Sequence, residues 1–183
     1  MSYRELKSYQ QGIVVYDMTV RFCKLYISGY SRTRDQMEQA ARSGKQNIVE
    51  ASSERTSESG ELKLLGVARA SWQELLEDYE DFLRQKGMGQ WTKDSQEAMF
   101  MRELYKEEEE KRKAAYEQCL KESGRAANCA ICLIHQVNFL LDRQIRVAEE
   151  KFVREGGYRE NLRRRRDNEI KREIISREWR KRS

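Results

Sequence analysis

Four polar residues in the first half of the chain have the types and spacing that an acid–base site needs. Ser43, Asn47 and Glu50 follow one another at about one helical turn, so they share a helix face, and Glu74 on a later helix can meet them. Paired carboxylates exchange protons with a substrate where a water-accessible cleft shifts their pKa values. Polar side chains inside helical bundles more often fix the register of the helices. We therefore predict a structural polar network and no catalytic residue.

Cys129, Cys132 and His135 recur at every third position of a helical segment. Thiolate and imidazole are zinc ligands, so this spacing raises the question of a metal site. Three ligands on successive turns of one straight helix drift around its axis, and the sequence offers no second cluster to complete a tetrahedral site. Because Ile134 and Val137 flank the histidine, we predict a core histidine beside two small apolar cysteines, and no metal.

The chain has four cysteines, which lie in helical patterns and lack the spacing of a disulfide framework. Reduced thiols in a cytoplasmic protein are therefore expected. The polar N-terminal segment does not resemble a signal peptide, and no apolar run reaches the roughly 18 residues of a membrane span. The sequence also lacks a nucleotide fingerprint and a nucleophile–histidine pairing. We expect a non-enzymatic protein without a cofactor or a membrane association.

The C-terminal segment is the strongest candidate for a binding site. Residues 154–183 carry 12 basic and 6 acidic groups, so the net charge of +5 arises there. Arginine binds phosphate bidentately and stacks on bases, and tryptophan also stacks. We predict contact with nucleic acid, although an acidic protein can use the same residues and charge runs are often only solvated. The predicted binding residues are Arg159, Arg163, Arg164, Arg165, Arg166, Lys171, Arg172, Arg177, Trp179, Arg180, Lys181 and Arg182.

The elements that position these residues are helices. The chain has no proline, and 37% of its residues are charged against 38% hydrophobic, a mix typical of long exposed helices. Apolar residues at intervals of three and four predict the helices of a bundle. Their ranges are 4–28, 31–57, 61–86 and 128–152, with an inserted helix over about 94–123 and a basic extension from 158 that is helical or, without a partner, disordered.

The last helix of this bundle is apolar on two faces. One stripe includes Ile131 and Ile134, and a second includes Leu133, Val137 and Leu140. A helix at the surface of a monomer needs one apolar stripe. The second stripe therefore needs a partner elsewhere in the chain or on another subunit. We predict that Leu133, Val137 and Leu140 lie in the interface of a homo-oligomer.

Three segments resemble a known family. Residues 36–51, with the text QMEQAARSGKQNIVEA, resemble the Q-x-x-x-A-A-x-S-x-x-x-N-I-A-E-G signature of bacterial four-helix-bundle proteins first recognised in intervening sequences of large-subunit ribosomal RNA genes. Ala68, Ser71, Glu74 and Leu75 are similar to that family's A-x-G-S-x-x-E-L motif, and residues 132–144 are similar to its suffix subgroup. The chain departs from the pattern at Gly44, Lys45, Ala51 and Ala70, where the family favours Ile, Pro, Gly and Gly.

This resemblance implies a fold and a function. The implied fold is all-α, an antiparallel up-and-down four-helix bundle over residues 1–157 with a basic C-terminal tail over 158–183. A relative of the same fold, the accessory variability protein of diversity-generating retroelements, forms a basic-lined pentamer and works with a reverse transcriptase. The resemblance therefore implies a homopentamer and a link to RNA. A protein–protein scaffold is the alternative, and an enzyme that uses Asn47, Glu50 and Glu74 is the weakest hypothesis.

Overall fold

The protein is all-helical, as the sequence predicts. The computed structural model describes residues 2–53 and 57–182, and these contain helices and loops but no strand. None of the described helices is long and apolar enough to cross a membrane. The α-helices are α1 (Lys7–Tyr26), α2 (Arg32–Ala51), α3 (Glu58–Gln85), α4 (Gln96–Glu103), α5 (Glu109–Cys119), α6 (Ser123–Glu155) and α7 (Tyr158–Arg182), and the 3-10 turns are η1 (Tyr3–Glu5) and η2 (Leu104–Lys106).

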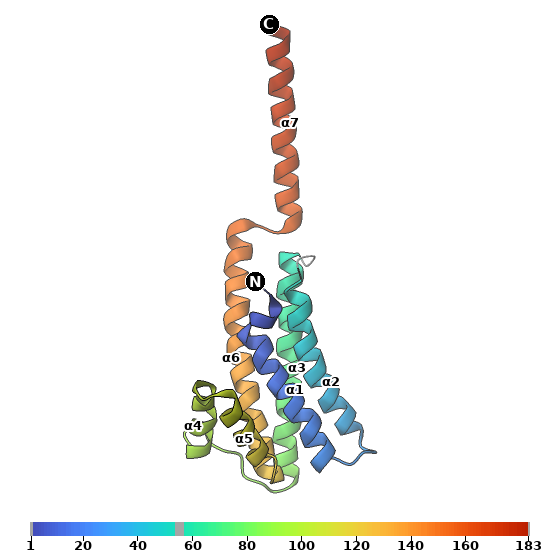
Figure 1. Ribbon diagram of the computed structural model, residues 1–183. Coiled ribbons are helices and arrows are strands. Elements are labelled where there is room, and N and C mark those ends of the chain that lie inside the picture. Colours follow the sequence, from blue (N-terminus) through green and yellow to red (C-terminus); the bar gives the residue numbers. More distant parts are fainter. Residues whose placement is uncertain (1, 54–56, 183) are drawn as a thin grey trace.

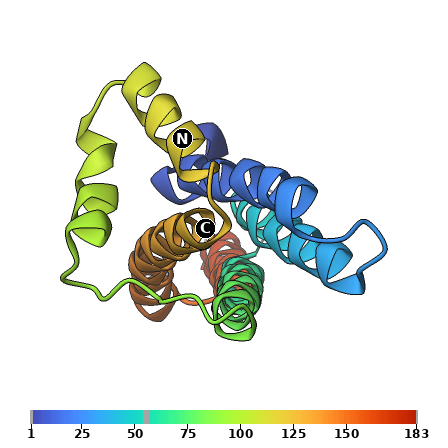
Figure 2. The same cartoon turned by 90° about the horizontal axis from the view of Figure 1, so that it is seen from below.

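Four long helices surround the core. Helix α1 packs against α2 and α6, while α3 packs against α2 and α6. Figure 1 shows these four side by side, with α4 and α5 on the flank and α7 projecting from one end. In the end-on view of Figure 2, α4 and α5 lie outside the group of four. The body and the projecting helix α7 are therefore two structurally distinct parts of the chain.

Serine side chains define the beginnings of several helices. The hydroxyl oxygens of Ser31, Ser57 and Ser95 accept hydrogen bonds from the backbone N–H groups of Thr33, Gly60 and Ala98. Such N-caps satisfy backbone donors that a helix leaves unpaired at its start. The cap at Ser57 starts α3 at Glu58, three residues before the predicted start. Helix α2 ends at Ala51, whereas the predicted helix extends to residue 57. Residues 54–56 of that predicted helix lie outside the described residues.

The core contains most of the positions that helical spacing predicts for α2 and α3. The predicted positions are Met37, Ala41, Gly44, Ile48 and Ala51 on α2 and Leu62, Leu65, Ala68, Trp72, Leu75, Tyr79 and Phe82 on α3. All of them are buried except Leu62, which is half-buried. The ring of Phe22 from α1 lies 4.9 Å from that of Tyr79 and 5.0 Å from that of Phe82, both edge-on. Edge-to-face aromatic pairs of this kind stabilise cores beyond the area that they bury.

The indole of Trp72 occupies a notch made by two glycines. A Cβ atom on Gly44 would lie 2.5 Å from Cε2 of Trp72, and one on Gly12 would lie 3.2 Å from Cζ2. A side chain at position 44 would therefore overlap the indole.

The packing face of α1 differs from the sequence prediction. The heptad pattern predicts that the first helix packs through Leu6, Tyr9, Ile13, Tyr16, Val20, Cys23 and Ile27. Cys23 is fully buried as predicted, but the other six residues are only half-buried. The rest of the buried face consists of Ser8, Gly12, Val15, Met18, Thr19 and Phe22. Small and polar residues can lie inside because Gly12 admits the indole and Thr19 donates to its own helix at Val15 O, 2.8 Å away, and accepts from Tyr79 Oη at 3.0 Å.

The inserted segment is two helices and not one. Helix α4 passes through η2 into extended backbone at Glu107 and Glu108, and α5 starts at Glu109. This break falls within four consecutive glutamates, whose like charges disfavour neighbouring turns of one helix. Glu107, Glu108 and Glu109 each precede a basic residue by four positions, which predicts three ion pairs. Two of them are present, Glu107 with Lys111 at 3.1 Å and Glu109 with Lys113 at 2.5 Å.

Candidate nucleic-acid interface

Helix α7 carries the predicted binding residues on a separate arm. Gly156 ends α6 with φ of 76°, a conformation that L side chains rarely adopt. The chain then turns at Gly157 and begins α7, where Asn161 Nδ2 donates to Gly156 O at 3.2 Å. Helix α7 projects away from the body (Figure 1). Two glycines therefore connect a compact body to a single helix.

The side chains of α7 are exposed along most of its described length. Trp179 is 73% exposed, and the exposed apolar residues Leu162, Ile170, Ile174 and Ile175 are spread around the helix without a continuous stripe. Hydrogen bonds from Arg164 to Asn161 at 2.8 Å and from Arg180 to Ser176 at 3.3 Å lie along its surface. A helix without an apolar stripe has no face made for burial in its own body. The guanidinium groups of α7 are thus available to an external partner.

The predicted binding residues lie in α7, but not all of their side chains can be placed. Arg163, Arg164, Arg165, Arg166, Lys171, Arg172, Arg177, Trp179 and Arg180 have described, exposed side chains. The side chains of Arg159, Lys181 and Arg182 lie outside the described residues. Arg172 also lies 3.7 Å from Glu169 in an ion pair whose side chains are 80% and 66% exposed. Exposed pairs contribute little to stability, so this contact does not prevent Arg172 from binding another anion.

Two of the four residues predicted as a polar network are joined. Asn47 Nδ2 donates to Ser43 O at 2.9 Å and to Ser43 Oγ at 3.2 Å, and Ser43 Oγ lies 2.9 Å from Ser71 Oγ. Ser71, which the sequence placed only in a family motif, thus contributes a hydrogen bond between α2 and α3. Ser43 and Asn47 are half-buried. Their hydrogen bonds hold the two helices in register.

The two carboxylates of the predicted network lie elsewhere. Glu50 is exposed and accepts from Gln46 Nε2 at 3.5 Å, while Glu74 is exposed at the edge of an open groove between α2 and α3. Arg32, Asp35, Ser43 and Ser71 also line this groove. Glu50 and Glu74 therefore do not form a buried network with Asn47. The helix period places Glu50 only near the face of Asn47, and the sequence could not show how far each carboxylate reaches into solvent.

Asp78 is a titratable group that the sequence patterns did not single out. Burial raises its pKa to about 6, and the neighbouring carboxylates of Glu74, Asp81 and Glu77 add to the shift. Its Oδ2 atom is buried without a hydrogen-bond partner among the described residues. The clustering of acidic residues in 74–81 was visible in the sequence, but the burial of Asp78 was not.

The prediction of a core histidine beside two apolar cysteines holds for the cysteines, since Cys129 is fully buried and Cys132 packs half-buried against the core. His135 is exposed, so the prediction of a core histidine is wrong. Its position is rotated by about 100° around the axis of α6 from that of the buried Ile134, which places it outside the apolar stripe. No group of three or more potential metal-ligating residues occurs among the described parts of the chain.

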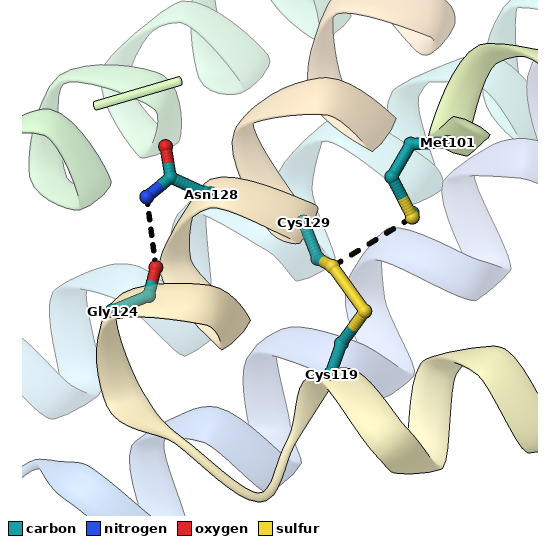
Figure 3. The surroundings of a disulfide bond; sticks show 5 residues. All are labelled: Met101, Cys119, Gly124, Asn128 and Cys129. Atoms are coloured by element: carbon teal, nitrogen blue, oxygen red, sulfur yellow. Dashed lines mark hydrogen bonds between the residues drawn. A yellow bond between two sulfur atoms is a disulfide. The ribbon is translucent and has the colours of Figure 1, made fainter. Parts of the chain in front are cut away.

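A disulfide joins Cys119 at the end of α5 to Cys129 on α6, so the expectation that all four thiols are reduced is also wrong (Figure 3). The sulfur of Met101 lies 3.7 Å from Cys129 Sγ. Burial raises the pKa of the remaining thiols, to about 12 for Cys23 and about 11 for Cys132. Thiols with such pKa values are weak nucleophiles at neutral pH.

The second apolar stripe of α6 is largely covered within the chain. Leu133 is 1% exposed and Val137 is fully buried, which contradicts their assignment to an oligomer interface. Helices α4 and α5 lie against α6, and Gln136 Nε2 donates to Met101 O at 3.0 Å. Helix α1 also lies against this side of α6, where Ser8 Oγ donates to Gln144 Oε1 at 2.7 Å. The second stripe is thus covered within the chain. Leu140, the third predicted residue, is half-buried.

Comparison with known proteins gives no relative for the chain. No family model, curated protein or solved structure matches it.

Proposed function

We propose that the protein is a non-enzymatic accessory protein that binds RNA or single-stranded nucleic acid through helix α7. The observation that carries this proposal is the position of the charge. The excess of basic groups lies on a helix that projects from the body with its arginines exposed. Guanidinium groups in this arrangement suit phosphate, and phosphate contacts give affinity with little sequence preference.

Truncation after Gly157 tests the proposal directly. The shortened protein should keep its fold, because α7 has no extensive contact with another described helix, but should lose most of its RNA affinity. Alanine at Arg163, Arg164, Arg165 and Arg166 should flatten the dependence of affinity on salt, by at most about 3 in log–log slope for a single strand. Fluorescence anisotropy at two salt concentrations measures both. Unchanged affinity after truncation would refute the proposal.

The proposal includes the architecture and the assembly that the family resemblance implies. We propose that α1, α2, α3 and α6 form an antiparallel up-and-down four-helix bundle, which the packing of each helix on its neighbours supports. We also propose a cytoplasmic homopentamer that works with a reverse transcriptase. Phe139 and Val147 on α6 are 61% and 65% exposed and lie near Leu140 on the helix surface, so this region replaces Leu133 and Val137 as the proposed interface.

A protein–protein scaffold is the second candidate function. The exposed isoleucines of α7, 46% to 58% exposed, favour it because apolar side chains on a projecting helix suit a protein partner. Under this alternative the arm binds an acidic protein. The anisotropy measurement separates the two functions, since a scaffold would show no affinity for RNA even at low salt.

A further inference from the structure

The charges of α7 are segregated around the helix. At 100° per residue, the continuous helix Tyr158–Arg182 has one face without a described acidic residue, which we call the acid-free face. It spans about 120° of the circumference, and its members with described side chains are Tyr158, Asn161, Arg164, Arg165, Asn168, Arg172, Ile175, Ser176 and Trp179. The opposite face carries Arg163, Arg166, Arg177 and Arg180 interspersed with Glu160, Asp167, Glu169 and Glu173. Lys171 lies at the border.

This segregation makes the two faces electrostatically different. The described charges of the opposite face cancel, whereas the acid-free face keeps three arginines. Arg164 is held toward Asn161 Oδ1 at 2.8 Å, within the same face. A polyanion that lay on the opposite face would meet these four carboxylates, at a cost from like-charge repulsion. The acid-free face presents arginine, asparagine and aromatic side chains. Glu169 borders it and pairs with Arg172 at 3.7 Å, but this exposed pair is weak and a phosphate can replace it.

If α7 binds nucleic acid as proposed above, its two faces should not contribute equally. We infer that the acid-free face binds one strand of nucleic acid along one side of α7. Arg164, Arg165 and Arg172 contact consecutive phosphates, and the exposed ring of Trp179 stacks on a base near the tip. From Asn161 to Trp179 the face is about 27 Å long at the helical rise of 1.5 Å per residue. Insertion of α7 into a duplex groove would instead place phosphates on both sides of the helix.

Two triple variants of the full-length protein test the inference. R164A/R165A/R172A removes the arginines of the acid-free face, and R163A/R166A/R177A removes three from the opposite face. Both variants lower the net charge of α7 by three. They differ only in the face of the helix from which the arginines are removed. The probe is a labelled oligouridine of about 20 nucleotides, long enough to span one arm. Circular dichroism checks that both variants keep the helix.

The first triple variant should weaken oligouridine binding about tenfold more than the second. Trp179→Ala should weaken it by a further factor of about 5 to 100, and Trp179→Phe should restore most of that loss because a ring remains. Equal losses from the two triples would overturn the inference in favour of binding by total charge or by groove insertion. If neither triple nor the truncation changes affinity, the proposed function itself fails.

Discussion

The close packing of Trp72 against Gly12 and Gly44 should contribute to the free energy of unfolding. Gly44→Ala should destabilise the protein by about 1–3 kcal/mol, because the added Cβ would lie 2.5 Å from the indole of a fully buried tryptophan. Gly66→Ala is the matched control. Gly66 is exposed in the middle of α3, and a Cβ added there would meet nothing within 4 Å, so alanine should stabilise by about 0.5–1 kcal/mol. Urea denaturation measures both, and a stabilising Gly44→Ala would contradict the packing.

Asp78 predicts a dependence of stability on pH. Its pKa is raised from the ordinary 3.8 to about 6, so the folded state retains a proton that the unfolded state loses between these values. Ionised Asp78 therefore destabilises the folded state. The whole of this effect is present above about pH 6, and it disappears as the pH falls toward 4. Asp78→Asn should be more stable than the wild type at about pH 7.5, with a smaller difference at about pH 4.5. Asp94→Asn, at an exposed loop position, serves as the control.

At this scale the sequence predicted some positions and not others. Met37 and Ile48 were found because large apolar side chains at helical spacing have few alternatives to burial. Ser8 and Thr19 were missed because nothing in their residue type indicates burial, which depends on partners from other helices, such as Gln144 Oε1 at 2.7 Å from Ser8 Oγ. His135 was misplaced because apolar neighbours in sequence lie on different sides of a helix.

Among the elements, the inserted helices α4 and α5 are held by few contacts. The disulfide from Cys119 to Cys129, the hydrogen bond from Tyr26 Oη to Leu120 O at 2.6 Å and an ion pair between Arg21 and Glu117 fasten the end of α5 to the body. Beside them is an apolar hollow of about 150 Å³, lined by Trp91, Phe100, Met101 and Ala115 among others. The disulfide is therefore a major part of what holds α5 in place.

Loss of this disulfide should loosen the insertion selectively. Cys119→Ser with Cys129→Ser, or reduction by a dithiol, should cost about 2–3 kcal/mol from the entropy of the opened loop. Hydrogen exchange should accelerate in α4 and α5 and remain slow in α2 and α3. Cys132→Ser, which leaves the bond intact, is the control. Unchanged exchange in α5 would show that its other contacts suffice. The sequence could not predict the pairing, because four cysteines allow several connectivities and only the fold brings these two together.

For the whole molecule, the family resemblance and the exposed part of α6 lead to a prediction about assembly. Phe139→Asp with Val147→Asp should convert the proposed oligomer into monomers, because each change puts a charge into an apolar contact. Light scattering at micromolar concentration measures the mass. Val67→Asp, at a residue of α3 that is 41% exposed, should leave the mass unchanged. A monomeric wild type would contradict the proposal.

The sequence predicted the helical class and the separate basic arm, since periodicity and charge are local properties of the chain. It correctly required a partner for the second stripe of α6 but assigned Leu133 and Val137 to another subunit. The reason is that periodicity marks a face as apolar but does not show which other element, α1 or the inserted α4 and α5, will cover it. A segment that covers a core through a few residues and one disulfide leaves little periodic signal.

The paired glycines before α7 have a consequence for protease sensitivity. A helix that has no extensive contact with another described element can open locally without unfolding the body, so its peptide bonds should be cleaved while those of the body resist. Trypsin cuts after arginine and lysine, which α7 supplies at nearly every turn. Brief digestion should therefore shorten the chain to a resistant fragment that ends near Gly157. If α7 binds RNA, oligouridine should protect Arg164 and Arg165 from cleavage, and mass spectrometry of the fragments would locate the protected segment.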